Sequence, residues 1–531
     1  MKPTVMRTVH NARYSSSGQS GQIQSRILTA ATLVTGLSIA ERALGFLYRI
    51  VLSRLIGAEG LGLYQVALSL FSVFLTLGTG GIPLTVSRLV TKSKAENDAK
   101  GASGAFTAGV VLSLALTLPA CLLFGVFGEK FAFFFSDERC LPVFRVLLIG
   151  LIFSSLYAVV RGAFWGEKEF LAPSVLELAE ESVMVLAGVL LLQNVTEPLL
   201  GAKSAAWAAV ISYLFSFTAS LVCFFVRGGK FSSPKKQFKP MFISTLPITS
   251  VRLSGTLVNS AVSVLFPAML IRAGASDSQA LTLLGVATGM AIPILMIPAT
   301  VIGSLSLVLI PELSEDFFRK NNARLYKNVE RGLRVALLVA FFLLPFFYAL
   351  GEDLGRLAFS NALAGEIIAK SCPLLLPMSL SMITTSILNS LGFERRTFVY
   401  YFIGAAAMLL CILFLPAVCG VYAYILGMGA SFVITAALNL LLLFQKCRNL
   451  FSMHGKHLLS ALARATLALF PLSLLGKLFS FLFKLVLGEL LAACATAFCL
   501  FLCTLILWSL LKLFSFKAVA LALKNKKTQK N

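Results

Sequence analysis

Charged residues are scarce in this sequence, and the residues that build metal or redox sites are scarcer still. Only 13% of the 531 residues are Asp, Glu, Lys or Arg, whereas soluble proteins carry about a quarter. The chain has three histidines, no Cys-x-x-Cys pair and no GxxxxGK[ST] motif. The sequence therefore excludes a P-loop ATPase within this chain, and it predicts neither a metal site nor a cofactor.

Apolar runs occupy most of the chain instead. Hydrophobic residues make up 58% of it, and apolar stretches recur from end to end. A helix that crosses a bilayer needs about 20 such residues. The runs are continuous and do not alternate with polar residues, which excludes a transmembrane β-barrel. The predicted fold class is an all-α polytopic membrane protein.

About 14 transmembrane helices are expected. Their ranges are 27–55, 61–90, 101–127, 141–161, 171–193, 201–226, 241–271, 281–310, 332–350, 367–391, 398–416, 421–444, 458–483 and 485–511. An even number of crossings puts both termini on the same side of the membrane. Most of the 46 Lys and Arg residues lie on the connections of that side. By the positive-inside rule, the N and C termini are cytoplasmic.

The same rule accounts for the formal net charge of +23, so nucleic acid is not an expected partner.

Two short motifs recur in the two halves of the chain. Ile-Pro-x-Thr-Val occurs in Gly81–Val90 and in Met296–Leu305, and WGEKEF (Trp165–Phe170) resembles GFERRTF (Gly392–Phe398). The order and offset of the matches predict two six-helix repeat lobes of the same orientation, followed by two C-terminal helices.

The resulting domain organisation has seven parts. They are a disordered cytoplasmic tail (1–25), an N-terminal lobe (26–226), a basic cytoplasmic linker (227–240), a C-terminal lobe (241–444), a cytoplasmic loop (445–457), helices 13 and 14 (458–511) and a basic cytoplasmic tail (512–531).

The segment ERALGFLYRIVLSR (Glu41–Arg54) places charges inside the first apolar run. A charge at the centre of a membrane helix costs roughly 2.5–3.5 kcal/mol on insertion scales. Arg42 and Arg49 are seven residues apart and therefore share one face of the helix. One guanidinium group can bind two phosphate oxygens at once. We therefore expect Arg42 and Arg49, together with Arg252 of the seventh run, to bind a phosphorylated substrate. Alternatively, Arg49 reaches the membrane interface and Arg252 makes a contact between helices.

Glutamates form a second intramembrane set. They are Glu41, next to Arg42, and Glu177, Glu180 and Glu181 in the fifth run. The spacing of the last three puts them on one side of a helix. Two interpretations stay open, namely cation or proton coupling and structural ion pairs with Arg42 or Arg252.

Three segments carry a family resemblance. RALGFLYRIVLSRLIGAEGLGLYQ (Arg42–Gln65), GGIPLTVSRLV (Gly80–Val90) and GVATGMAIPILMIPATVIGSLSLVLIPELSE (Gly285–Glu315) resemble the stage V sporulation protein B and polysaccharide-export family. That family is related to the lipid II flippases in the multidrug/oligosaccharidyl-lipid/polysaccharide (MOP) exporter superfamily.

The resemblance implies a function and a location. It implies two six-helix lobes around a central cavity, a lipid-tail groove formed by the last two helices, and alternating access. The implied cargo is an undecaprenyl-pyrophosphate-linked sugar, such as lipid II or a related cell-wall or polysaccharide precursor. The implied flippase turns it from the inner to the outer leaflet of the bacterial cytoplasmic membrane. Membrane lipid is a further partner, and cell-wall synthesis proteins are candidate partners.

One departure from the resemblance concerns arginines. Lipid II flippases also carry arginines on helices 2 and 8, whereas here neither helix has one in its membrane interior. Arg252 is the expected substitute.

Two other functions compete with the flippase as explanations of the sequence. A multidrug or cation antiporter of the same superfamily would use the glutamates of the fifth run, and the intramembrane arginines argue against it. A membrane polymerase or glycosyltransferase would need carboxylates or a nucleophile in a sizeable outer loop, and the expected outer loops are short. We therefore expect a transporter and not an enzyme.

Overall fold

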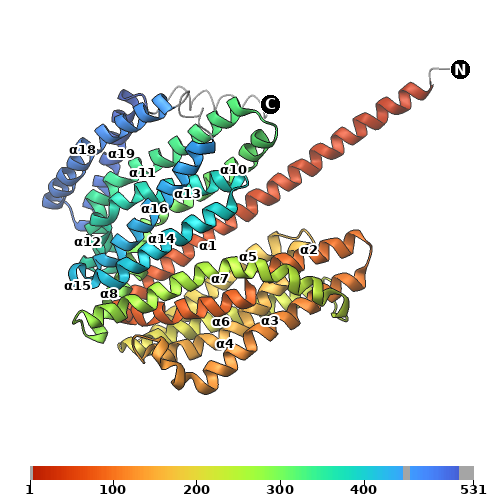
Figure 1. The fold of residues 1–531 in the computed structure, drawn as a ribbon, viewed down its shortest axis with the longest axis horizontal. Helices are drawn as coiled ribbons and strands as arrows, with labels where there is room; N and C mark the ends of the chain where they lie inside the picture. Colours follow the sequence, from red (N-terminus) through yellow and green to blue (C-terminus); the bar gives the residue numbers. More distant parts are fainter. Residues whose placement is uncertain (1–3, 447–454, 514–531) are drawn as a thin grey trace. The chain divides into compact units, whose positions relative to one another are not determined.

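The computed structural model describes residues 4–446 and 455–513, and every regular element in these ranges is a helix (Figure 1). This confirms the all-α membrane class. The helices are α1 (Thr4–Thr79), α2 (Ile82–Ala95), α3 (Ala99–Phe127), α4 (Cys140–Gly166), α5 (Leu171–Leu192), α6 (Pro198–Val226), α7 (Lys235–Arg272), α8 (Asp277–Leu284), α9 (Ile292–Leu295), α10 (Ile297–Phe318), α11 (Asn322–Phe359), α12 (Ala362–Ser371), α13 (Leu375–Ser390), α14 (Glu394–Phe414), α15 (Pro416–Cys419), α16 (Tyr422–Lys446), α18 (Gly455–Val486) and α19 (Glu489–Leu510). Three short segments of other helix types are η1 (Gly128–Phe134), η2 (Gly285–Ala291) and η3 (Cys372–Leu374).

Thirteen helical stretches of the described residues are long and apolar enough to cross a membrane. The difference from about 14 has local causes. The first two expected helices count as one stretch, Leu33–Ala95, because α1 continues through a bend at Gly57 (φ 68°). α5 is not among the thirteen stretches, because its three glutamates make it too charged. The helix expected over 281–310 is divided into two stretches, Asp277–Leu295 and Ile297–Phe318. The exact number of crossings and the side of the termini stay predictions.

Prolines mark several of the helix breaks. Pro83, Pro293 and Pro298 each lie in the first turn of a helix, in α2, α9 and α10. Proline has no N–H to donate and a fixed φ, so it suits the start of a helix and disrupts its middle. The π-helical segment η2 directly precedes α9.

The chain divides into two compact units, Met1–Ala261 and Val262–Asn531. In the first unit, α2, α3 and α4 pack around a core that includes Val86, Phe106 and Phe164. Close approach of α4 to α2 requires a glycine, because a Cβ atom on Gly162 would lie 2.6 Å from the carbonyl oxygen of Pro83. Small residues at helix contacts are the usual means of tight packing within membranes.

The second unit has two hydrophobic cores. One lies between α10, α11, α13 and α16 and includes Leu333 and Ile383. The other joins α11 to α18 and α19 through Phe341, Leu472 and Trp508. The last two helices thus pack beside α11 (Figure 1).

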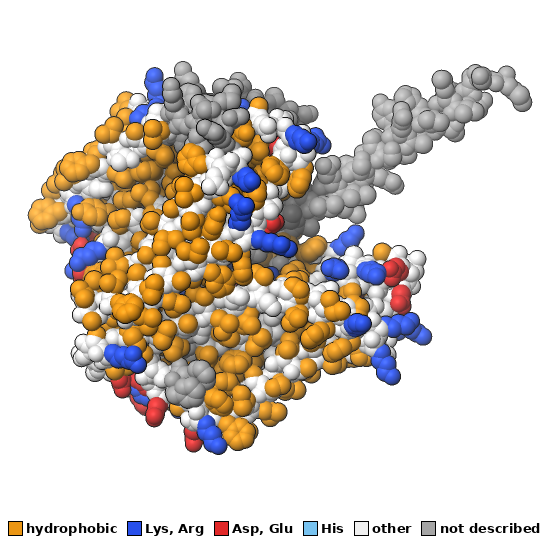
Figure 2. Space-filling model, viewed as in Figure 1, with side chains coloured by type: hydrophobic (Ala, Val, Ile, Leu, Met, Phe, Trp, Pro, Cys, Tyr) orange, Lys and Arg blue, Asp and Glu red, His pale blue; other side chains and the backbone are white. Residues whose placement is uncertain are grey.

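Apolar side chains cover most of the surface visible in Figure 2, and most of the charged ones lie toward its edges. Large exposed side chains such as Leu122, Leu186 and Phe470 are typical of helices that face lipid. The side-chain distribution agrees with a multi-pass membrane protein.

The first helix begins earlier than expected. Residues 1–25 were expected to form a disordered tail, whereas α1 is helical from Thr4. Extending an existing helix adds a hydrogen bond per residue without a new nucleation cost, which explains the continuation into a polar segment.

The division between the units also differs from the expected linker, 227–240. It lies inside α7, because the first part of α7 packs on the junction of α1 and α2. Met241 belongs to the first core, and a Cβ atom on Gly81 would lie 3.0 Å from the Thr249 hydroxyl.

Two of the expected parts fall largely outside the described residues. These are the loop 445–457 and the tail 512–531. The two six-helix repeats stay a prediction.

Replacing Gly162 by alanine is expected to destabilise the first unit by about 1–3 kcal/mol, because the new methyl group overlaps the backbone of α2. The measurement is the thermal unfolding midpoint of the detergent-purified protein. Gly125→Ala in α3 is the matched control, because nothing lies within 4 Å of its Cβ position. Equal midpoints for the two variants would contradict the close α2–α4 packing.

Candidate functional site

An acidic cavity of about 250 Å³ lies within the first unit, between α1, α4, α5 and α6. It brings together all four glutamates that the sequence singled out. The lining residues are Glu41, Leu75, Thr79, Ser154, Tyr157, Ala158, Arg161, Glu177, Glu180, Glu181 and Tyr213. With every group ionised, four carboxylates and one guanidinium would give the lining a formal charge of −3.

Helix geometry explains how α5 and α1 meet at this cavity. Glu177, Glu180 and Glu181 lie three and four residues apart, so they project from the same side of α5. α1 approaches them at Gly45, where a Cβ atom would lie 2.9 Å from Oε1 of Glu181. A larger residue at position 45 would therefore displace the Glu181 carboxylate.

Arg161 of α4 is the cation of the acidic cavity. Its Nη1 atom lies 2.7 Å from Oε1 of Glu177, and the exposed fractions of the two side chains are only 27% and 22%. The guanidinium also lies over the rings of Trp165 and Tyr157, at 5.1 and 5.7 Å from their centroids. These contacts hold Arg161 in one orientation toward α5.

The sequence-based pairing of the glutamates with Arg42 or Arg252 is therefore corrected for Glu177. Arg42 and Arg252 are both exposed, and neither forms an ion pair with a described carboxylate. Arg161 was missed because it stands at the end of the fourth apolar run, where an interface position is the usual interpretation. Trp165, one turn later in the same helix, was a signal that could have indicated a stacked arginine.

One carboxylate of the acidic cavity is incompletely paired. The Oε2 atom of Glu180 is buried without a hydrogen-bond partner among the described residues, and so is Nε of Arg161. An unpaired carboxylate oxygen in an apolar environment is costly. A bound cation or a proton would remove that cost.

The three predicted substrate-binding arginines lie outside the acidic cavity. Arg42 and Arg49 of α1 and Arg252 of α7 are exposed side chains of the first unit. Arg49 lies one turn after Gly45, the residue that touches Glu181. Their role in substrate binding stays a prediction.

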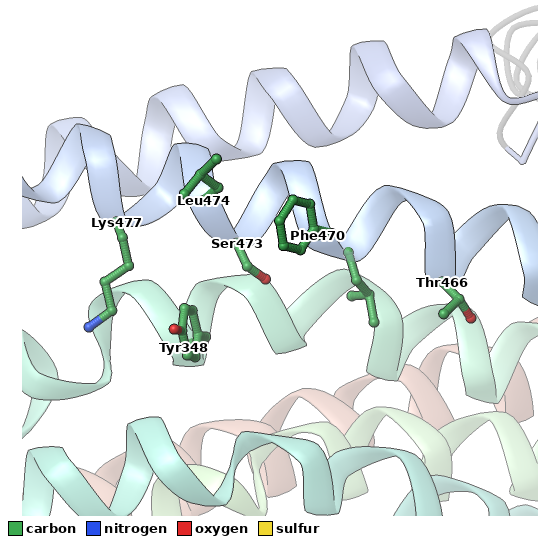
Figure 3. A pocket seen from close by; sticks show the side chains of 7 residues that line it. Tyr348, Thr466, Phe470, Ser473, Leu474 and Lys477 are labelled. Atoms are coloured by element: carbon green, nitrogen blue, oxygen red, sulfur yellow. The ribbon is translucent and has the colours of Figure 1, made fainter.

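A second cavity, of about 530 Å³, lies in the second unit between α11 and α18. This α11–α18 groove is lined by Tyr348, Thr466, Leu469, Phe470, Ser473, Leu474 and Lys477. In Figure 3, Lys477 lies near Tyr348 at one end of the labelled set and Thr466 lies at the other.

Polar contacts lie at one end of the α11–α18 groove. Nζ of Lys477 lies 3.1 Å from Oε1 of Glu352 and 5.3 Å from the centroid of the Tyr348 ring. The resemblance implied a groove made by the last two helices. The α11–α18 groove is lined by one of these two helices, α18, and by α11, whereas α19 contributes to the core that they share. Binding of a lipid tail there stays a prediction.

Comparison with known proteins agrees with this architecture. The chain matches the family described as "Polysaccharide biosynthesis protein" over residues 27–317. It is 27% identical to stage V sporulation protein B of Bacillus subtilis, over 71% of this chain and 74% of the relative. It is 24% identical to the lipid II flippase MurJ of Bacillus subtilis, over 73% and 77% of the two chains.

Solved structures of two kinds share the fold. The lipid II flippase MurJ in its inward closed conformation aligns with a TM-score of 0.67, at 14% identity, over 90% of this chain and 99% of that one. An inward-facing multidrug resistance MATE transporter of the MOP superfamily aligns with a TM-score of 0.63, at 14% identity, over 77% and 96%. This chain therefore belongs to the polysaccharide biosynthesis protein family and has the fold of the MOP transporter superfamily.

Proposed function

We propose that this protein is a flippase for an undecaprenyl-pyrophosphate-linked sugar, lipid II or a related cell-wall or polysaccharide precursor. It moves this substrate from the inner to the outer leaflet of the bacterial cytoplasmic membrane by alternating access. The observation that carries the proposal is the sequence similarity to stage V sporulation protein B and to a lipid II flippase, over about three quarters of each chain.

The exposed arginines supply the chemistry for the pyrophosphate. A guanidinium is permanently charged and presents two parallel N–H donors to phosphate oxygens. Arg42, Arg49 and Arg252 are exposed in the first unit and none forms a described ion pair with a carboxylate, so binding an anion does not require breaking one.

The α11–α18 groove suits the prenyl chain. Leu469, Phe470 and Leu474 make most of its lining apolar. Its volume of about 530 Å³ lies in the range of roughly 300–1,000 Å³ that is usual for binding sites.

A cation antiporter is the second candidate, and the acidic cavity is the observation that favours it. Four glutamates around about 250 Å³ suit a cation or protons better than a pyrophosphate. The two proposals are compatible if Glu41, Glu177, Glu180 and Glu181 couple an ion gradient to the movement of the lipid.

The first expected result concerns the arginines. In vesicles containing purified protein, flipping of fluorescent lipid II is expected to fall at least about tenfold for Arg49→Ala and for Arg252→Ala, because each loses a charge-assisted phosphate contact. Arg42→Ala is expected to reduce it in the same direction. Arg272→Ala, at the end of the same α7, is the control. Unchanged flipping in Arg49→Ala and Arg252→Ala would put the anion site elsewhere.

If the folded parent protein flips no lipid II, another polyprenyl-linked glycan becomes the next substrate to test. If that glycan is not transported either, cation or drug antiport is the next activity to measure in the same vesicles.

Filling the α11–α18 groove is expected to reduce transport. Ser473→Trp places a large ring in the groove, and the expected effect is a several-fold loss of lipid II flipping with normal expression. Leu467→Trp is the matched control, since Leu467 lies on α18, is 70% exposed and does not line the groove. A similar loss in both variants would argue against a tail site in the groove.

Coupling through the acidic cavity is tested with Glu180→Gln. If the cavity binds the coupling ion, an imposed sodium or pH gradient should accelerate flipping in the parent protein and have no effect in this variant. Glu169→Gln, outside the cavity, should keep the gradient response. A gradient response that survives in Glu180→Gln would leave Glu180 with a structural role.

A further inference from the structure

A basic pocket of about 410 Å³ lies at one end of the first unit, where α2, α4 and α6 finish and α3 begins. Its charged lining residues are Lys94, Arg227, Lys230 and Glu167. Three cations and one carboxylate give the lining a formal charge of +2. The floor of the basic pocket is apolar and includes Phe106 and Phe224.

The loop that carries Lys230 is held in place on both sides. On the N-terminal side of Lys230, Gly228 adopts φ 83°, and the N–H of Gly229 donates to the carbonyl oxygen of Phe224 at 2.9 Å. A Cβ atom on Gly229 would overlap the Phe224 ring. After it, the N–H of Ser232 donates to the Thr107 hydroxyl at 3.2 Å. The pocket is therefore a packed feature of the fold.

Two of the three cations are already paired. Lys94 lies 2.8 Å from Glu167, and Arg227 lies 3.2 Å from Glu169, with all four side chains partly exposed. Exposed pairs of this kind contribute little and can be shared with a ligand. Lys230 has no ion-pair partner in the part of the chain that the structure describes.

The surrounding loop adds positive charge. The segment 227–240 has five basic residues and no acidic one, and three of the five lie beyond the pocket lining. Clusters of this size next to a transmembrane helix attract anionic lipid headgroups. The first turn of α3 also lines the pocket, but the carboxylate of Asp98 already caps this helix end by accepting from the N–H of Gly101, so the anion is bound by side chains and not by the helix end.

The carboxyl ends of α2, α4 and α6 oppose anion binding, because they carry partial negative charge. The partial negative charge at these helix ends is reduced, because one carbonyl in the last turn of each helix accepts a hydrogen bond. The donors are the N–H groups of Asp98, Glu169 and Gly229. Side chains with full positive charge therefore dominate the local field.

Exposed apolar side chains lie beside the basic pocket. Phe225, Val226 and Phe231 are 43%, 82% and 55% exposed. The Phe231 ring packs on Phe106 of the pocket floor, with 5.4 Å between centroids. A ligand with both a phosphate and hydrocarbon chains would satisfy the cations and cover these rings.

We propose that the basic pocket binds the phosphate of an anionic phospholipid, with Lys230 and Arg227 as its cations and Phe225, Val226 and Phe231 against its acyl chains. In the orientation proposed above, this phospholipid belongs to the cytoplasmic leaflet. The site is separate from the arginines and the groove assigned to the transported lipid, so it does not depend on the flippase proposal.

The test is a calorimetric titration of the full-length, detergent-purified protein with short-chain phosphatidylglycerol and, separately, with short-chain phosphatidylcholine. Saturable binding of phosphatidylglycerol alone is expected. Lys230→Gln is expected to weaken it about fivefold, the contribution of one cation near an anionic headgroup. Lys230→Arg should retain it.

Two control variants separate charge from folding. Lys100→Gln removes a lysine from the first turn of α3 that does not line the pocket, and binding should not change. Arg227→Gln should weaken binding about fivefold. Glu169→Gln breaks the same ion pair without removing the cation, and it should not weaken binding.

Three results would overturn the proposal. The first is equal affinity for phosphatidylglycerol and phosphatidylcholine. The second is an equal effect of Lys230→Gln and Lys100→Gln. The third is displacement of phosphatidylglycerol by inorganic phosphate at similar concentration, which would assign the pocket to soluble phosphate compounds instead of a lipid.

Discussion

An ionised side chain inside a membrane needs a partner or water, and the interior of the first unit is arranged around that requirement. Four glutamates from α1 and α5 face one cavity, and Arg161 of α4 pairs with one of them. The arrangement depends on close helix contact, because Gly45 leaves just enough space for the Glu181 carboxylate. The unpaired Oε2 atom of Glu180 is the feature on which the proposed binding of a cation or a proton rests.

In the second unit, ion pairs and small residues keep a groove open. At one end of α18, Lys477 pairs with Glu352 and Lys484 pairs with Asp353 of α11. Toward the other end, the alanines at positions 461, 465 and 468 are buried in the core that α18 shares with α11 and α19. Because α18 is attached at both ends, the space beside Phe470 and Leu474 does not collapse.

Composition and hydropathy predicted the helical membrane fold, because in lipid the backbone must satisfy its own hydrogen bonds within each helix. The spacing of Glu177, Glu180 and Glu181 likewise predicted a shared face of α5. The partner Arg161 could not be predicted, since pairing depends on which helix packs beside α5. The break between the units inside α7 and the position of the groove against α11 also depend on tertiary packing, which hydrophobic periodicity along one helix does not encode.

The geometry of α1 directs two neighbouring residues of opposite charge to different surroundings. Glu41 lines the acidic cavity, whereas the next residue, Arg42, is exposed. Successive side chains on an α-helix point about 100° apart, so α1 can present the Glu41 carboxylate to the cavity and the Arg42 guanidinium elsewhere. Arg49, one turn after Gly45, lies close to the face of α1 that touches Glu181. A pyrophosphate would be repelled by the carboxylates of the acidic cavity and attracted by the arginines. If the proposed roles hold, an anion at Arg49 and a cation in the acidic cavity would be near enough to influence each other across Glu181, whereas Arg42 points away from the cavity.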